Sequence, residues 1–113
     1  MTDKIVVLVT ASGVRQAKKI ARALVEGRLA ACVNLVSPVV SVYRWEGKLS
    51  EDRECLLVIK STREQFEAVR VCVERLHSYS VPEVIALPIV DGAPNYLSWI
   101  ADSTAPAGGA AKK

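Results

Sequence analysis

The side chains best suited to bind a transition metal are the single histidine, His77, and three cysteines, Cys32, Cys55 and Cys72. Their number matches the ligand set of a closed zinc site. Closed zinc sites, however, use short local spacings such as C-x-x-C, whereas these cysteines are widely separated. Thiolate and imidazole are also good copper ligands. An open copper-type site is therefore the metal chemistry that these residues allow.

Motifs for covalent or phosphate chemistry are missing from the sequence. No Ser or Cys lies in a recognisable nucleophile motif, and G-x-S-x-G does not occur. Ser12-Gly13 is too short to read as a phosphate-binding loop. We therefore expect a protein that is not an enzyme and that needs no obligatory cofactor.

Charge and composition narrow the class of partner. Half of the 113 residues are hydrophobic, 24% are charged, and the formal net charge of +3 falls to +1 without Lys112 and Lys113. A nearly neutral domain does not carry the basic footprint of a nucleic-acid-binding protein. The longest apolar runs, such as Ile5–Val9, are too short to cross a bilayer. We expect neither a nucleic-acid nor a membrane partner.

The cysteines and the N-terminus indicate the compartment. An odd number of widely spaced cysteines among apolar neighbours suits reduced thiols better than disulfides. The first ten residues lack the pattern of a signal peptide. The sequence therefore predicts a cytoplasmic protein.

Hydrophobic periodicity predicts one domain over residues 1–102, followed by a flexible tail over residues 103–113. The predicted elements are a strand over 4–10 covered on both faces, a helix from 14 capped by Ser12 and ended by Gly27, strands over 30–44 and 48–60, a helix opened by a capping box of Ser61 with Glu64 or Thr62 with Gln65, a strand over 83–90 and a helix over 96–101. A bulge or sheet edge is expected at Ser37-Pro38, because proline cannot donate to a ladder. This β-α-β-β-α-β order predicts a ferredoxin-like α+β fold. RNA-recognition modules share the order but stack bases on central-strand aromatics, which are missing here.

The two middle strands are too long for the helices that cover them. The first helix spans about 21 Å at ~1.5 Å per residue. Each hairpin arm reaches about 46 Å at ~3.3 Å per residue. Tyr43 and Trp45, beside the predicted Glu46-Gly47 turn, therefore lie on a projecting ribbon. Packing against other copies of the chain would bury them. The alternative is that they fold back onto their own domain.

A set of short motifs makes the chain resemble the CutA family of divalent-cation tolerance proteins from Ile5 to Ala101. The motifs are Ala30-Ala-Cys-Val-Asn34, Tyr43-Arg-Trp-Glu-Gly-Lys48, Glu54, Lys60-Ser61, His77-Ser-Tyr79, Pro82-Glu83 and Tyr96-Leu-Ser-Trp99. The resemblance implies a homotrimer in which long hairpins join three sheets edge to edge. The family in turn resembles the trimeric PII signalling proteins. That likeness implies a second role, as a PII-like small-ligand sensor or scaffold for which metal is incidental.

The resemblance also implies metal ligands, which this sequence matches only in part. Some bacterial members use a first-strand cysteine and a histidine pair, whereas Val9 and Leu76-His77 occupy those positions here. Only His77 therefore matches this copper motif. Cys32, which matches a more widespread family cysteine, is expected to join His77 and Glu54 in an alternative site between subunits. The competing interpretation makes Cys32 a small core residue and His77 a solvated helix end.

Five polar or aromatic family matches are difficult to explain by packing alone. They are Tyr43, Trp45, Lys48, Lys60 and Tyr79, which we expect to form a pocket for a ligand or at an interface. Glu54 and Lys60 lie on one face of one strand and are expected either to pair or to line a cleft. The resemblance thus implies a trimeric protein of divalent-metal, particularly copper, tolerance, for which we expect at most weak metal binding. The PII-like sensor is the alternative.

Overall fold

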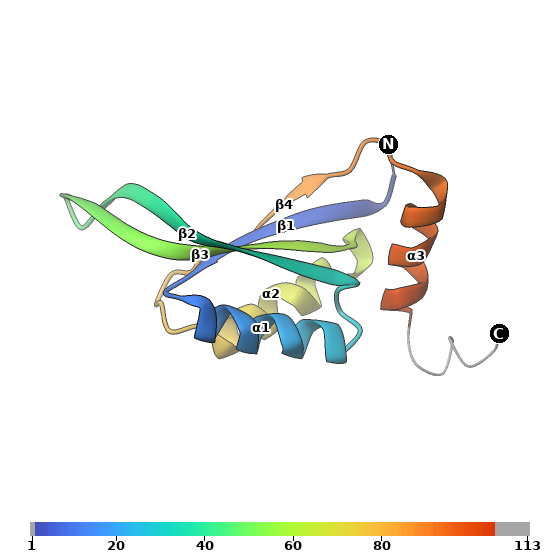
Figure 1. Ribbon diagram of the computed structural model, residues 1–113, viewed down its shortest axis with the longest axis horizontal. Coiled ribbons are helices and arrows are strands. Elements are labelled where there is room, and N and C mark those ends of the chain that lie inside the picture. The colour runs from blue at the N-terminus through green and yellow to red at the C-terminus, as the bar shows by residue number, and fades with distance from the viewer. Residues whose placement is uncertain (1, 106–113) are drawn as a thin grey trace.

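The computed structural model describes residues 2–105, which form one antiparallel sheet with two helices on one face and a third at its end (Figure 1). The elements are β1 Lys4–Ala11, α1 Val14–Glu26, β2 Cys32–Trp45, β3 Lys48–Thr62, a 3₁₀ turn Arg63–Gln65, α2 Phe66–Leu76, β4 Ile85–Pro88 and α3 Pro94–Thr104. The strands lie in the order β2-β3-β1-β4. This order confirms the predicted ferredoxin-like fold.

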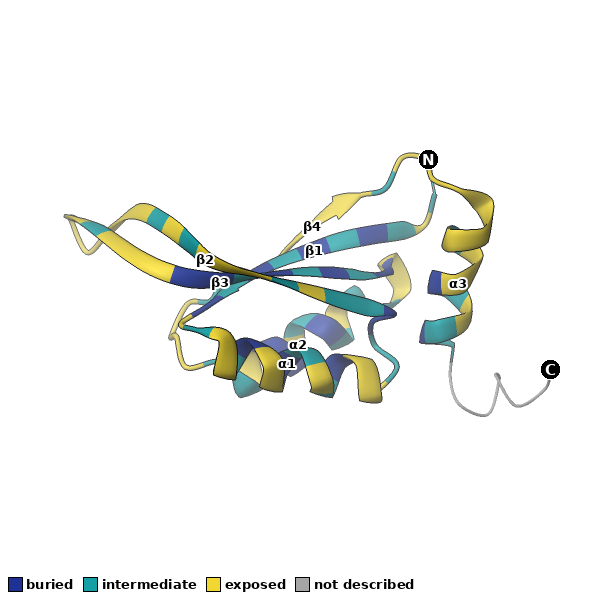
Figure 2. Cartoon of the chain, in the orientation of Figure 1, coloured by how far each residue is buried: buried dark blue, intermediate teal, exposed yellow. Residues whose placement is uncertain are grey.

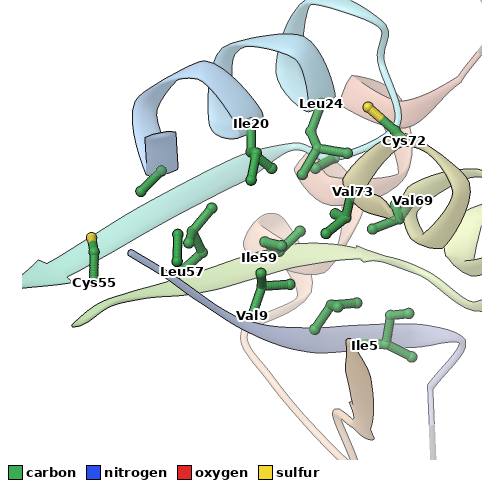
Figure 3. Close-up of a cluster of buried hydrophobic side chains, with 14 residues drawn as sticks. Ile5, Val9, Ile20, Leu24, Cys55, Leu57, Ile59, Val69, Cys72 and Val73 are labelled. Carbon is green, nitrogen blue, oxygen red and sulfur yellow. The ribbon is translucent and has the colours of Figure 1, made fainter. Parts of the chain in front are cut away.

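The core lies between the sheet and the helices α1 and α2. In Figure 3, Ile20 and Leu24 of α1 point toward Leu57 and Ile59 of β3, and all four side chains are completely buried. Alternate residues of β1 are fully buried on this side and half-buried on the other. The prediction that the first strand is covered on both faces is therefore correct only for the helix side. Within one chain the opposite sheet face stays open.

Gly27 ends α1 as predicted, but the predicted N-terminal caps are wrong. The N-cap of α1 is Gly13 and not Ser12, and neither α1 nor α2 begins with a side-chain capping bond. β3 continues as far as Thr62 and directs the buried Ser61 side chain into the domain. There the Ser61 hydroxyl donates a 2.6 Å hydrogen bond to the carbonyl of Leu29. Extension of the strand therefore removes Ser61 from the expected capping box.

The C-terminal helix is longer than predicted, and the fourth strand is shorter. α3 continues through Thr104, whose side chain is buried. The guanidinium of Arg28 donates to the carbonyl oxygens of Asp102 and Ala105, which secures the end of this helix. The folded domain therefore includes the first residues of the predicted tail, and residues 106–113 lie outside the described part. No helix within residues 2–105 is long and apolar enough to cross a membrane.

The β2–β3 hairpin projects from the domain, as predicted, and gives the chain extents of 52 × 26 × 22 Å (Figure 1). Its turn residues Glu46 and Gly47 both have positive φ, at 50° and 80°. Burial ends at Glu54, and the outer ribbon is exposed in Figure 2. Tyr43 is 38% and Trp45 47% exposed, so their own chain does not bury them.

A β-bulge at Ser37-Pro38 decides which face the hairpin aromatics share. Val36 pairs with Leu56, but the next pair is Val39 with Glu54, so two residues of β2 oppose one of β3. The extra residue reverses the alternation of β2. Tyr43 and Trp45 therefore lie on the open face of the sheet, together with Glu54. The predicted bulge is confirmed.

Candidate functional site

A cleft of about 610 Å³ lies where the hairpin leaves the domain. One wall is the hairpin, and the other is the segment that follows α2. The lining residues are Thr10, Ser41, Val42, Tyr43, Trp45, Asp52, Glu54, Tyr79, Ser80, Val81 and Glu83. The cleft therefore combines three aromatic side chains with three carboxylates.

Strand register explains why the hairpin side of the cleft carries these groups. Ser41 pairs with Asp52 and Tyr43 with Ser50, and these pairs share the open face with Glu54. Asp52 and Glu54 are two residues apart on β3 and point to the same side. The bulge in β2 brings the aromatic side chains to that same side. Local backbone geometry thus assembles half of the cleft.

Tyr79 connects the opposite wall to the hairpin. Its hydroxyl donates a 2.6 Å hydrogen bond to Oε2 of Glu54, a residue that is only 7% exposed. Burial, together with the Glu54 carboxylate, raises the pKa of Tyr79 well above its usual range. The hydroxyl therefore remains a proton donor at neutral pH and holds this carboxylate in a fixed orientation.

The cleft is negatively charged without compensation from its own lining. Asp52, Glu54 and Glu83 line it, and no Lys or Arg does. Partial desolvation in the cleft, and next the charge of Glu54, raise the pKa of the Glu83 carboxyl, although the residue as a whole is exposed. The ion pairs within residues 2–105 lie elsewhere, between Lys4 and Asp3 and between Arg70 and two glutamates of α2. The three carboxylates of the cleft thus lack a cationic partner in the described chain.

Tyr43 also orients a carboxylate, nearer the hairpin tip. Its hydroxyl donates to Oδ2 of Asp52 across the two strands. This hydrogen bond is the main reason that the pKa of Tyr43 is raised. Tyr43 and Tyr79 therefore each donate to one carboxylate and leave the remaining carboxylate lone pairs to face the cleft.

His77 holds the segment that carries Tyr79. Its Nδ1 accepts a 3.1 Å hydrogen bond from the backbone N–H of Tyr79. We therefore assign the ring proton to Nε2, which donates to the carbonyl of Thr10 at 2.7 Å. Both ring nitrogens are thus occupied, and the imidazole lies 4.6 Å from the Tyr79 ring. The half-buried His77 side chain therefore links β1 to this segment through two hydrogen bonds, and it is not the solvated helix end of the competing interpretation.

Cys32 and Lys60 lie at the other end of the sheet. They are paired across β2 and β3, and the Lys60 ammonium and the Cys32 thiol both contact the side-chain oxygen of Asn34. Lys60 lies six positions after Glu54 along β3, roughly 20 Å at ~3.3 Å per residue. The predicted Glu54–Lys60 pair is therefore wrong. Cys32 is half-buried on the open face, so it is not a core residue either.

The structure brings together only some of the predicted site residues. Tyr43, Trp45, Glu54 and Tyr79 share the cleft, whereas Lys48, the cross-strand partner of Trp45, does not line it, and Cys32 and Lys60 lie at the far end of the sheet. Within residues 2–105, no group of three or more His, Cys, Asp or Glu side chains is placed to hold a metal ion. One chain therefore does not gather His77, Cys32 and Glu54 into a site.

Two carboxylates of the cleft, Asp52 and Glu83, were not predicted as site residues from the sequence. Asp52 is separated from Glu54 by one residue, so its period-two spacing on a strand was a signal that it faces the same way. Glu83 reaches the cleft only through the path of residues 79–83 and gave no comparable signal beyond its place in the Pro82-Glu83 motif.

Comparisons with known sequences identify the family. The family model described as CutA1 divalent ion tolerance protein matches residues 5–103. The "Divalent-cation tolerance protein CutA" of Thermus thermophilus is 48% identical over 99 residues, which are 88% of this chain and 96% of that protein. The "Protein CutA, chloroplastic" of Arabidopsis thaliana is 48% identical over 100 residues, and the match covers 88% of this chain but 55% of that protein. The chain thus spans about half the length of this plant relative.

Solved structures agree with the sequence comparisons. The divalent cation tolerance protein (Cut A1) of Thermus thermophilus has a TM-score of 0.88 at 47% identity, with coverage of 90% of this chain and 99% of that one. CutA1 from Oryza sativa has a TM-score of 0.88 at 45% identity, with coverage of 90% and 94%. On the fold, the matched residues and these identities, the chain belongs to the CutA1 divalent ion tolerance family.

Proposed function

We propose that this protein is a homotrimeric, non-enzymatic ligand-binding protein of divalent-cation tolerance, with the cleft beside Glu54 as its ligand site. The observation that carries the proposal is the cleft itself, a cavity of about 610 Å³ that a single chain already forms. Small-molecule sites are typically concave, partly preformed cavities of roughly 300–1,000 Å³. This role corresponds to the PII-like sensor interpretation, with the tolerance function coming from the family.

The need for partner chains follows from the unprotected surfaces of the sheet. β2 and β4 are its two edges, and Val36, Ile85 and Leu87 on its open face are 47–49% exposed. Unpaired edges and apolar sheet faces favour association with further strands. Two different edges fit a head-to-tail contact, which closes into a ring when the rotation permits. The resemblance to the family sets the expected number of subunits at three.

Light scattering after size exclusion tests the assembly, and a thermal-shift screen tests the ligand site. We expect the mass of three chains and stabilisation by a small molecule. A variant with Glu54→Gln should lose part of that stabilisation, whereas Glu51→Gln, on the same strand outside the cleft, should not. A monomeric mass, or stabilisation that is identical in both variants, would contradict the proposal.

Weak binding of copper or another divalent cation is the second candidate, and the names of the relatives favour it. Cys32, His77 and Glu54 are the expected ligands, contributed by more than one subunit because one chain separates them. A copper titration of the assembled protein, repeated with Cys32→Ser and His77→Ala, tests this role. Copper affinity that falls in both variants supports a metal site, and unchanged affinity excludes these ligands.

The free thiols support a reducing compartment. Cys32, Cys55 and Cys72 form no disulfide within residues 2–105, and Cys55 and Cys72 are buried. Burial raises the pKa of the Cys55 thiol and so lowers its reactivity. We infer a cytoplasmic protein, and fractionation of cells that express it would test this location.

A further inference from the structure

We propose that the cleft binds a small organic cation, an ammonium or amine carried on a short carbon skeleton. The inference rests on the proposed function, because it names the chemical class of ligand for the same cleft. It is argued from three features of the site: its charge, its aromatic walls and its size.

The cleft is more acidic than the nearly neutral domain that carries it. The formal net charge of the chain is +1 without Lys112 and Lys113, yet the cleft lining contains Asp52, Glu54 and Glu83 and no basic residue. A buried carboxylate without a cationic partner is unfavourable unless hydrogen bonds or a bound cation compensate it. Glu54 is 7% exposed, and its one side-chain partner is the neutral Tyr79 hydroxyl. The cleft therefore carries negative charge that its own lining does not neutralise and that a cationic ligand can.

The aromatic walls select the kind of cation. Tyr43, Trp45 and Tyr79 line the same cavity as the carboxylates. A cation over an aromatic face gains electrostatic attraction from the ring, and tryptophan is the strongest partner. Within its own chain Trp45 is 47% exposed, so its ring makes no extensive contact there that a ligand would have to displace. Aromatic rings beside carboxylates are typical of sites for substituted ammonium groups.

Cavity size and ligand geometry disfavour a bare metal ion as the occupant. A volume of about 610 Å³ fits an organic molecule and far exceeds what a single metal ion fills. Metal ions require several converging ligand atoms. Within residues 2–105, no three acidic, His or Cys side chains converge in this way. An organic cation uses the separated carboxylates and the rings together.

A pair of probes that differ only in charge tests the inference. Choline and its uncharged isostere 3,3-dimethyl-1-butanol have the same shape, and putrescine adds a second ammonium. Isothermal titration of the assembled protein should give binding of choline and putrescine, with the neutral isostere weaker by about tenfold or more. Binding of the charged probes should weaken as salt is added.

Matched variants locate the binding. Glu54→Gln keeps an acceptor for Tyr79 and removes the charge, and Trp45→Leu removes the ring. Each should weaken choline by about tenfold. Glu51→Gln and Trp99→Leu, which alter an exposed acid and an exposed tryptophan outside the cleft, should bind choline normally. Circular dichroism of each variant checks that the fold is retained.

The outcomes separate this inference from the proposed function. Equal affinity for choline and its neutral isostere would overturn the organic-cation site. An affinity for choline that is unchanged by Glu54→Gln would overturn it as well. If no ammonium probe binds although the protein has the mass of a trimer, the organic-cation site is also overturned. In that case a neighbouring subunit closes the cleft, or the cleft takes another class of ligand. Choline binding to a protein that elutes as a monomer would support the cation site and reject the trimer.

Discussion

The hydroxyl of Tyr79 donates a 2.6 Å hydrogen bond to the carboxylate of Glu54, and this contact ties the segment after α2 to the base of the hairpin. The bond lies at the last buried position of β3 before the hairpin becomes exposed. His77 fixes the same segment from the other side through Thr10. The shape of the cleft therefore depends on two contacts between residues distant in the sequence.

Replacement of Tyr79 by Phe should lower the free energy of unfolding by about 1–3 kcal/mol, because it removes the donor from a nearly buried carboxylate. Chemical denaturation measures this change. Tyr43→Phe is the matched control, since the hydrogen bond of Tyr43 to Asp52 is exposed, and its loss should have a much smaller effect. Equal losses in the two variants would show that the burial of Glu54 does not matter.

Glu83→Gln should increase stability at neutral pH and change it less in acid. Partial desolvation and the charge of Glu54 raise the folded-state pKa of Glu83 above its ordinary value of 4.5. A raised carboxyl pKa means that the protonated form is favoured in the fold. The stability that Glu83 contributes is therefore present below pH 4.5 and is lost as pH rises through the folded-state pKa.

Thermal melts of wild type and Glu83→Gln across this pH range provide the measurement, and the difference between the two curves should grow with pH. Glu51→Gln serves as the control for removing an acid outside the cleft. A difference that is constant with pH would mean that the folded protein does not disfavour the Glu83 carboxylate.

Ser61→Ala should destabilise the domain by about 1–3 kcal/mol, because it removes a fully buried hydroxyl that donates to the carbonyl of the half-buried Leu29. Ser78→Ala, which alters an exposed hydroxyl, should leave the unfolding midpoint within experimental error. If Ser61→Ala is as mild as Ser78→Ala, a water or a shifted backbone donor must satisfy Leu29.

Leu87→Lys should convert the proposed homotrimer into smaller species, because it places a charge on the open sheet face beside the free edge of β4. Val71→Lys is a matched control on the outer surface of α2, since Val71 and Leu87 are both 47% exposed. Light scattering after size exclusion compares the two masses. Dissociation of both variants, or of neither, would argue against assembly through the open face.

The sequence predicted the fold well where the signal is local. Apolar periodicity identified each strand and helix, Pro38 marked the bulge, and Gly47 marked the turn. The reach of the hairpin followed from residue counts and standard rises alone. Helix ends were predicted less well, because whether Ser61 caps a helix or continues a strand depends on pairing with β1.

The candidate site was only half predictable, and the reason is its long-range geometry. Tyr43, Trp45 and Glu54 could be grouped because they lie on one hairpin. The role of His77 depends on the carbonyl of Thr10, 67 residues away in the chain. The distance between Glu54 and Lys60, by contrast, follows from the standard rise per residue of a strand. The expected ion pair between them was inconsistent with that rise.

The single extra residue in β2 at Ser37-Pro38 constrains how hairpin length can vary among related chains. Beyond the bulge, inserting or deleting one residue in each arm would turn every following side chain over and exchange Tyr43 and Trp45 for their neighbours on the cleft side. Growth or shortening by two residues per arm would preserve the orientation of the tip. Among related chains, the length of each hairpin arm should therefore differ by an even number of residues. A change by an odd number would require a second bulge to restore the orientation.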